Sequence, residues 1–431
     1  MNDALFPRAA ACAAALLATT APALAQQEVT LTAQGYVDET INLAIDDLAP
    51  ASSAARTVAD ILAYDLEFSL RFNVIEGNPG VVPRSGTDYE AWAIFGTEYL
   101  VTGGVEPTGA GYRADLALHH VPFQRRIRDL TLALPAIDSP GFRAAVHDAS
   151  NRVILELTGE QGVADTKVAF ASRRRGDKEI YTIDYDGHHP TRVTALDTIS
   201  MTPDWHPSGA EICFTTFVTG DPDLYCAPAG GGRARPISTN KGLDMAPGWS
   251  PDGSRLAMTL TKDGNAEIYV LNVGGRSLRR LTYNMGIDTA PSWSPNGRRI
   301  VFESDRTGRS QIYTMDAEGA NERQITFGGE AHSPAWSPLG DRMAYVERVG
   351  GRFQIVTIDP NGGGRTVMTS IGDNEDPSWS PDGLHIAFSS TRGGGSDIYT
   401  MDWDGRNVRK VTQGGAYVSP SWSPRLRSGG R

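Results

Sequence analysis

The sequence predicts an N-terminal α/β domain followed by an all-β, six-bladed β-propeller. A Pro-x-Trp cluster returns six times along the 431 residues, at intervals of 43 or 44 residues, which is the spacing of propeller blades. Each interval also contains short apolar runs bounded by Gly, Pro, Asn or Asp, the pattern of short strands separated by turns. The six tryptophans are Trp205, Trp249, Trp293, Trp336, Trp379 and Trp422.

The first 25 residues are predicted to be an export signal. Arg8 precedes a short apolar run over residues 9–17, and Ala23-Leu24-Ala25 supplies the small residues that a signal peptidase requires. We therefore expect cleavage after Ala25. No later stretch reaches the roughly 18 to 20 apolar residues of a membrane helix, so we expect a soluble mature chain.

Residues 26–165 are predicted to form a small α/β domain, because they lack the repeat and mix helical with strand-like patterns. Gly159 and Gly162 mark the passage from this domain into the propeller. The expected elements are, in order, a helix over 54–70, a strand over 71–75, the segment 89–95 leading into a strand over 99–105, alternating runs over 112–120 and 124–134, and a helix over 141–158.

Residues 166–431 are predicted to form the propeller, closed into a ring by the C-terminal strand. The first three strands, from Lys167 to Ala195, precede any Pro-x-Trp cluster, whereas the last cluster, at Pro420, has no strands after it. Joining these parts gives six four-stranded blades and leaves no open sheet edge between the first and the last. Because proline cannot donate to a strand ladder, each Pro-x-Trp strand is expected at a sheet edge beside the central channel, with its tryptophan pointing toward a neighbouring blade.

Two cysteines, Cys213 and Cys226, lie in one predicted hairpin outside the export signal. Placing them opposite each other also places Phe214 opposite Tyr225, so the pairing keeps like faces together. In an oxidising compartment this arrangement allows a cross-strand disulfide. The alternative is two small buried thiols, and the sequence leaves both open.

The formal net charge of −11 disfavours nucleic acid as a partner. An acidic chain lacks the excess of Lys and Arg that releases counterions from phosphate backbones. A basic protein surface is the better complement to this charge.

The loops that precede the Pro-x-Trp clusters are predicted to surround one mouth of the propeller channel and to bind a partner. Their acidic residues would focus a negative field on that mouth and speed association with a basic partner, although any single acid could equally be a solvated loop residue. These acids are Asp244, Asp288, Glu330, Asp373, Glu375 and Asp376. The candidate partner-binding residues are Met201, Thr202, Asp244, Met245, Ala246, Asp288, Thr289, Ala290, His332, Ser333, Glu375, Asp376 and Val418.

Several local sequences together resemble one family over the whole mature chain. They are His147-Asp148-Ala149-Ser150-Asn151, the junction from Leu157 to Gly162, the Trp-Ser-Pro-Asp-Gly turns, and the stretch from Pro420 to Leu426. With the export signal and the N-terminal domain, they are similar to TolB, the periplasmic component of the Tol-Pal system of Gram-negative bacteria.

This resemblance implies a periplasmic, non-enzymatic adaptor without a cofactor, which supports envelope integrity and outer-membrane constriction during cell division. It implies that the propeller binds the lipoprotein Pal, which would hold the chain at the outer membrane, and we expect a monomer. It also implies that TolA binds the first mature segment. The alternation in that segment allows it to add a strand to a partner's sheet or to fold back, while the alternative is an ordinary first strand. The segment comprises Glu28, Val29, Thr30, Leu31, Thr32, Ala33, Gln34, Gly35, Tyr36, Val37, Asp38 and Glu39.

The alternative function is a propeller enzyme, such as a metal-dependent lyase acting on an envelope glycan. The sequence offers little for such chemistry, because it has no Gly-x-Ser-x-Gly motif and no histidine pair at i, i+4 spacing. Asp184-x-Asp186-Gly187 superficially resembles a calcium loop but lacks the later ligands, so turn chemistry explains it. We expect no metal site and no catalytic residue.

Overall fold

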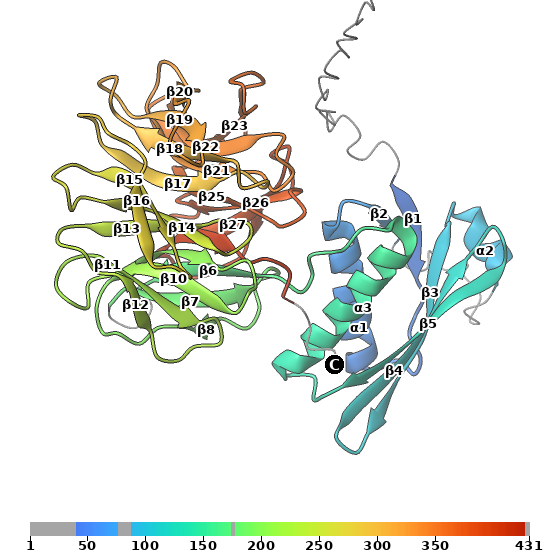
Figure 1. The fold of residues 1–431 in the computed structure, drawn as a ribbon. Helices are drawn as coiled ribbons and strands as arrows, with labels where there is room; N and C mark the ends of the chain where they lie inside the picture. Colours follow the sequence, from blue (N-terminus) through green and yellow to red (C-terminus); the bar gives the residue numbers. More distant parts are fainter. Residues whose placement is uncertain (1–39, 76–87, 174–176, 427–431) are drawn as a thin grey trace, which may run out of the picture. The chain divides into compact units, whose positions relative to one another are not determined.

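The computed structural model describes residues 40–75, 88–173 and 177–426 (Figure 1). The predicted export signal and the candidate TolA-binding segment lie outside these residues. Within them an α/β domain precedes a six-bladed propeller, so the predicted fold class is confirmed. No helix in the described ranges combines the length and the apolar character that a membrane-spanning helix requires.

The α/β domain is built on a five-stranded sheet of order β2–β1–β3–β4–β5, in which β1 runs parallel to both β2 and β3. Helices α1 and α3 lie together against one face of this sheet (Figure 1), and Trp92 of α2 packs against Ala44 and Leu100 on the other. The strands are β1 (Ile41–Ile45), β2 (Phe72–Ile75), β3 (Tyr99–Thr108), β4 (Gly111–His120) and β5 (Arg125–Leu134), and the helices are α1 (Ser53–Phe68), α2 (Tyr89–Ile94) and α3 (Pro140–Thr158).

The two long helices begin and end on residues suited to those positions. The Ser52 side chain accepts a hydrogen bond from the backbone N–H of Ala55 and so caps α1. Ser139 caps α3 in the same way, and Pro140 supplies the first helical residue without losing a hydrogen bond. Helix α3 ends at Gly159, whose φ of 74° lies in the left-handed region that glycine adopts readily. Both helices therefore lie close to their predicted positions.

The propeller consists of six four-stranded sheets. Blade 1 contains β6 (Lys167–Ser172), β7 (Glu179–Asp184), β8 (Thr191–Arg192) and the last strand of the chain, β29 (Tyr417–Trp422). Blade 2 contains β9 (Ser200–Trp205), β10 (Glu211–Thr216), β11 (Asp223–Pro228) and β12 (Arg235–Ser238), and blade 3 contains β13 (Asp244–Trp249), β14 (Arg255–Leu260), β15 (Glu267–Asn272) and β16 (Ser277–Arg280). Blade 4 contains β17 (Asp288–Trp293), β18 (Arg299–Ser304), β19 (Gln311–Asp316) and β20 (Arg323–Gln324). Blade 5 contains β21 (Ala331–Trp336), β22 (Met343–Val349), β23 (Arg352–Ile358) and β24 (Thr366–Val367), and blade 6 contains β25 (Asn374–Trp379), β26 (His385–Ser390), β27 (Asp397–Asp402) and β28 (Arg409–Lys410).

The ring closes through the C-terminal strand, as predicted. Strand β29 pairs antiparallel with β6, so the end of the chain completes the first blade. The repeated tryptophans pack against a neighbouring blade, and three of them also donate a hydrogen bond to it. Trp293 Nε1 donates to the Gly248 carbonyl of blade 3 at 3.0 Å, Trp205 Nε1 to the Ser421 carbonyl of β29 at 3.1 Å, and Trp379 Nε1 to the Ala335 carbonyl of β21 at 3.2 Å. Each of the six Pro-x-Trp strands lies at the edge of its sheet, so the predicted roles of the proline and the tryptophan are confirmed.

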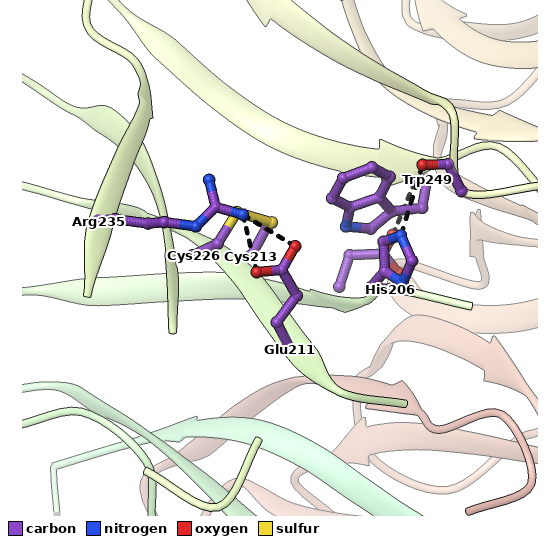
Figure 2. Close-up of a disulfide and its surroundings, with 8 residues drawn as sticks. His206, Glu211, Cys213, Cys226, Arg235 and Trp249 are labelled. Atoms are coloured by element: carbon purple, nitrogen blue, oxygen red, sulfur yellow. Dashed lines mark hydrogen bonds and ion pairs between the residues drawn. A yellow bond between two sulfur atoms is a disulfide. The ribbon is translucent and has the colours of Figure 1, made fainter. Parts of the chain in front are cut away.

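Blade 2 contains the predicted cross-strand disulfide (Figure 2). Cys213 of β10 lies directly opposite Cys226 of β11, and Phe214 lies opposite Tyr225, so the predicted register is confirmed together with the bond. Both cysteines are buried between blades 2 and 3. The disulfide therefore resolves the choice that the sequence left open.

Helices α1 and α3 meet blade 1 in a buried polar cluster. The Asp65 carboxylate accepts a hydrogen bond from the Tyr185 hydroxyl and lies 2.8 Å from His147 Nδ1. On its other side, His147 Nε2 lies 3.3 Å from Asp186, which also pairs with Arg143. Burial opposes a charge on His147, yet the two carboxylates prevail and raise its pKa to about 9. The imidazole is therefore protonated at neutral pH and bridges the two carboxylates.

Candidate functional site

The innermost strands of the six blades enclose a channel with a cavity of about 440 Å³. All six strands enter from the same face, because each follows a crossover from the outermost strand of the preceding blade. The lining at the entry end is Thr202, Ala246, Ala290, Ser333, Asp376 and Ser419, and the lining at the exit end includes Pro207, Pro251, Pro338, Pro381 and Pro424. The loops that were predicted to surround one mouth therefore do lie at one end of the channel.

The six residues at the entry end share an unusual backbone conformation. Each is a non-glycine residue with φ between 47° and 53°, and each lies where the pairing to the next strand shifts register. Positive φ is uncommon for such residues, and a bulge of this kind redirects a side chain. Because the bulge recurs in all six blades, it is part of the architecture of the channel mouth. No local sequence pattern marks this bulge, since the positions are filled by Thr, Ala, Ser and Asp rather than glycine.

Strand alternation divides the predicted site residues into two groups. The second residue of each innermost strand is half-buried or exposed, whereas the first residue is buried, because successive side chains of a strand point to opposite faces of the sheet. The second residues are Met201, Met245, Thr289, His332, Glu375 and Val418, and the first residues are Ser200, Asp244, Asp288, Ala331, Asn374 and Tyr417.

Asp244 and Asp288 therefore differ from the expected mouth acids, because both are fully buried. The Asp244 carboxylate accepts hydrogen bonds from Ser238 and from the backbone of Asn240, at 2.7 and 2.8 Å. The Asp288 carboxylate accepts from Asn284 Nδ2 at 2.6 Å and pairs with Arg306 at 2.8 Å. Both carboxylates thus hold crossover loops in place and are not presented to a partner.

Four of the predicted mouth acids form a group that we call the acidic sector: Glu330, Asp373, Glu375 and Asp376. Glu375 is exposed, whereas the other three are half-buried. These residues lie in or beside the loops that lead into β21 and β25. Burial raises the pKa of Glu375, and the negative charges of Asp376 and Asp373 raise it further. Such crowding of like charges makes a cationic partner group favourable at this side of the mouth.

His332 adds a titratable cation beside the acidic sector. Its Nδ1 lies 2.9 Å from Glu303, and the hydrogen bond to that carboxylate raises the pKa of His332 despite partial burial. The negative charge of the acidic sector is therefore partly offset by this histidine and by Arg348, which lies 3.4 Å from Glu330.

Large apolar side chains, absent from the predicted site, stand exposed beside the same mouth. We call them the apolar rim: Tyr283, Met285, Ile287, Phe327 and Ile371. They belong to the crossover loops before β17, β21 and β25, and Met285 is 99% exposed and Phe327 76% exposed. A gathering of exposed apolar side chains next to a polar rim is typical of a protein interaction site. These residues could have been found from the sequence, because each is a large apolar residue in a loop that contains Gly or Asn, where a polar residue is expected.

Among the described residues, one grouping of possible metal ligands occurs, and it lies away from the channel mouth. It combines Glu211 with Cys213 and Cys226. The disulfide occupies both sulfur atoms, and Glu211 pairs with Arg235 at 2.8 Å (Figure 2). The disulfide and this ion pair account for all three side chains.

Two family models match the chain. The model described as the TolB beta propeller domain matches residues 155–426, and the TolB amino-terminal domain matches residues 29–127. The propeller match alone covers more than half of the chain.

Curated relatives bear a single name. Over 181 residues the chain is 38% identical to the Tol-Pal system protein TolB of Geobacter sulfurreducens, covering 40% of this chain and 41% of that protein. Over 168 residues it is 40% identical to the protein of the same name from Geobacter metallireducens, covering 38% of each. The chain spans about two fifths of the length of these curated relatives.

One solved structure matches both domains. The crystal structure of TolB from Acinetobacter baumannii has a TM-score of 0.76 and 27% identity, covering 90% of this chain and 97% of that chain. This likeness extends the two family matches over the whole fold. The chain therefore belongs to the TolB family.

Proposed function

We propose that the chain is a non-enzymatic adaptor of the Tol-Pal system in the periplasm, and that its channel mouth binds the outer-membrane lipoprotein Pal. In this role it links Pal to TolA and supports envelope integrity and outer-membrane constriction during cell division. The observation that carries the proposal is the pairing of the apolar rim with the acidic sector at one mouth. An apolar anchor beside a charged rim is the usual composition of a protein-binding surface.

The two parts of the mouth would contribute differently to binding. Exposed side chains such as Met285 and Phe327 lose water contact when covered, so they would supply most of the affinity. The acidic sector would mainly raise the association rate for a basic surface, and this contribution would fall with added salt.

A titration of the purified periplasmic part of Pal against matched variants tests this proposal. Replacing Met285, Phe327 and Ile371 together by serine should weaken binding about tenfold or more, because apolar anchors dominate such interfaces. The matched control replaces three exposed apolar residues of the outer blade edges by serine, and it should bind as the parent does: Leu278, Val367 and Val408. Equal affinity for all three proteins would place the Pal site elsewhere.

The candidate TolA-binding segment, residues 28–39, is tested separately. Deleting it should abolish capture of TolA and leave Pal binding intact, because the proposal assigns the two partners to different parts of the chain. Loss of both partners would contradict two separate sites. Turnover of an envelope glycan by the purified chain would instead favour the enzymatic alternative.

A further inference from the structure

The α/β domain contains a groove that the channel-mouth proposal does not use. Its cavity has a volume of about 480 Å³ and lies between the first half of α1, the loop after β1 and the end of β2. Alanines spaced by four residues, three on α1 and one just before it, form one wall, and because their side chains are short they leave the groove open. These residues are Ala51, Ala55, Ala59 and Ala63.

The opposite wall of the groove is apolar and firmly held. It is formed by Ile45, Leu48, Val74 and Ile75. The loop after β1 is fixed to β3, since the backbone N–H of Asp46 donates to Val101 at 2.9 Å and that of Ala49 donates to Gly103 at 3.1 Å. A preformed wall of this kind lowers the ordering cost of binding.

Strand β2 gives the groove an open sheet edge. It stands last in the sheet and pairs only with β1 among the described strands. The N–H of Ile41 donates to the carbonyl of Arg71, so in the alternating pattern of a parallel ladder the backbone groups of Asn73 also face β1. The N–H and C=O groups of Phe72 and Val74 consequently face away from β1, and no described residue accepts from or donates to them. Open edges of this type accept an added strand.

Negative charge predominates around the groove. Asp46, Asp47 and Asp60 line it, against one cation, Arg56. Within the described residues none of the three carboxylates forms an ion pair, so their charges are available to a ligand.

From these features we infer that the groove binds an extended, basic peptide segment of a protein partner, which adds as a strand to β2. Alternate apolar side chains of the segment would pack over the alanine wall, while its Lys or Arg residues would approach Asp47 and Asp60. This site is separate from the channel mouth and does not depend on the function proposed for that mouth. It gives the α/β domain a binding role of its own.

A fluorescent peptide of alternating Val and Lys is the probe, tested by anisotropy on the full mature chain. Ala59→Leu fills the groove and should weaken binding about tenfold or more, because a filled pocket excludes the apolar side chains. The matched control is Ala133→Leu, at an exposed alanine of the other edge strand β5, and it should bind as the parent does. Replacing Asp47 and Asp60 together by Asn should weaken binding severalfold and flatten its salt dependence. A peptide of alternating Val and Glu should not bind.

Hydrogen exchange locates the added strand. Peptide binding should slow exchange of the Phe72 and Val74 amides, while Val74→Pro, which removes an N–H that faces away from β1, should prevent binding. Three results would overturn the inference: no binding of the Val-Lys peptide, undiminished binding by the Ala59→Leu chain, or strong protection of the Phe72 and Val74 amides before peptide is added. The last result would mean that the protein itself already covers this edge. Serine substitution of the apolar rim should leave peptide binding unchanged, which separates this site from the Pal site.

Discussion

The propeller and the α/β domain differ in how much their residues reveal about their own roles. Each position of a blade occurs six times, so the first residue of the innermost strand can be compared across Ser200, Asp288 and their four counterparts, all of which are buried. In the α/β domain each position occurs once, and a residue such as Asp65 has no internal counterpart. Departures from the repeat therefore identify candidate functional residues in the propeller, whereas in the α/β domain only contacts and burial distinguish one residue from another.

This difference explains why the mouth residues separate so clearly. A carboxylate at the buried first position is structural in blades 3 and 4, while a carboxylate one residue later, at Glu375, is exposed. The apolar rim stands out for the same reason, since Met285 occupies a loop whose counterparts in other blades are mostly small or polar. Each residue of a blade can thus be compared with the residues at the equivalent position in the other five blades.

Removing the last strand should produce the largest effect, because it breaks the ring on which the repeat depends. A chain ending at Gly415 loses β29, exposes the edge of β6 and removes Trp422 from the core between blades. Burial of one such tryptophan is worth about 3–5 kcal/mol, and the strand pairing is lost as well. We expect no cooperative unfolding of the propeller in urea, followed by circular dichroism. A chain ending at Leu426 is the control, and a closed ring that survives loss of β29 would refute the role of the C-terminal strand.

Two single substitutions test whether the buried and the exposed acids near the mouth contribute differently to stability. Asp288→Ala removes the acceptor of Asn284 and one of the two carboxylates that pair with Arg306, and it should destabilise the protein by about 2–3 kcal/mol. Glu375→Ala, in the acidic sector, should change stability by less than about 0.5 kcal/mol. Thermal or urea unfolding measures both. Equal effects would show that strand alternation does not divide the mouth as described.

The buried polar cluster around His147, where α1 and α3 meet blade 1, predicts a smaller, pH-dependent effect. The pKa of His147 is raised to about 9 in the folded chain, above an ordinary value of about 6.5. Its stabilising contribution is therefore complete below about pH 6.5 and is lost as the pH rises through about 9, a loss on the order of 1–3 kcal/mol. Urea unfolding between neutral pH and pH 10 measures it. His147→Gln should flatten this dependence, and an unchanged slope in that variant would assign it to other groups.

Much of the fold could be predicted from the sequence because the pattern of one blade recurs six times. Six tryptophans fixed the number of blades, the unmatched strands at the two ends predicted closure, and the register of Cys213 against Cys226 allowed the disulfide. Helices α1 and α3 were readable from their apolar spacing. Strand β1 was not identified, because it is a five-residue interior strand with apolar residues on both faces, and such a run lacks the alternation that marks a half-buried strand.

Only the general position of the candidate site could be predicted from the sequence. The position of the mouth followed from the repeat, but the bulge at Thr202 and its five counterparts depends on how each innermost strand pairs with the next. The position of Asp244 and Asp288 just before a Pro-x-Trp cluster predicts that they lie at the mouth, although alternation along a strand turns them inward. The groove beside β2 depends on which strand lies at the sheet edge, which no local pattern specifies.

Hydrogen exchange with and without the periplasmic part of Pal tests whether the channel mouth is the surface that binds Pal. If the channel mouth is the docking surface, exchange should slow in the crossover loops before β17, β21 and β25, which carry the apolar rim and the acidic sector. The hairpins at the proline-lined end, such as that between β15 and β16, should exchange as in the free chain. Slowed exchange at that end, or no change at the mouth while Pal is bound, would contradict docking of Pal at the mouth.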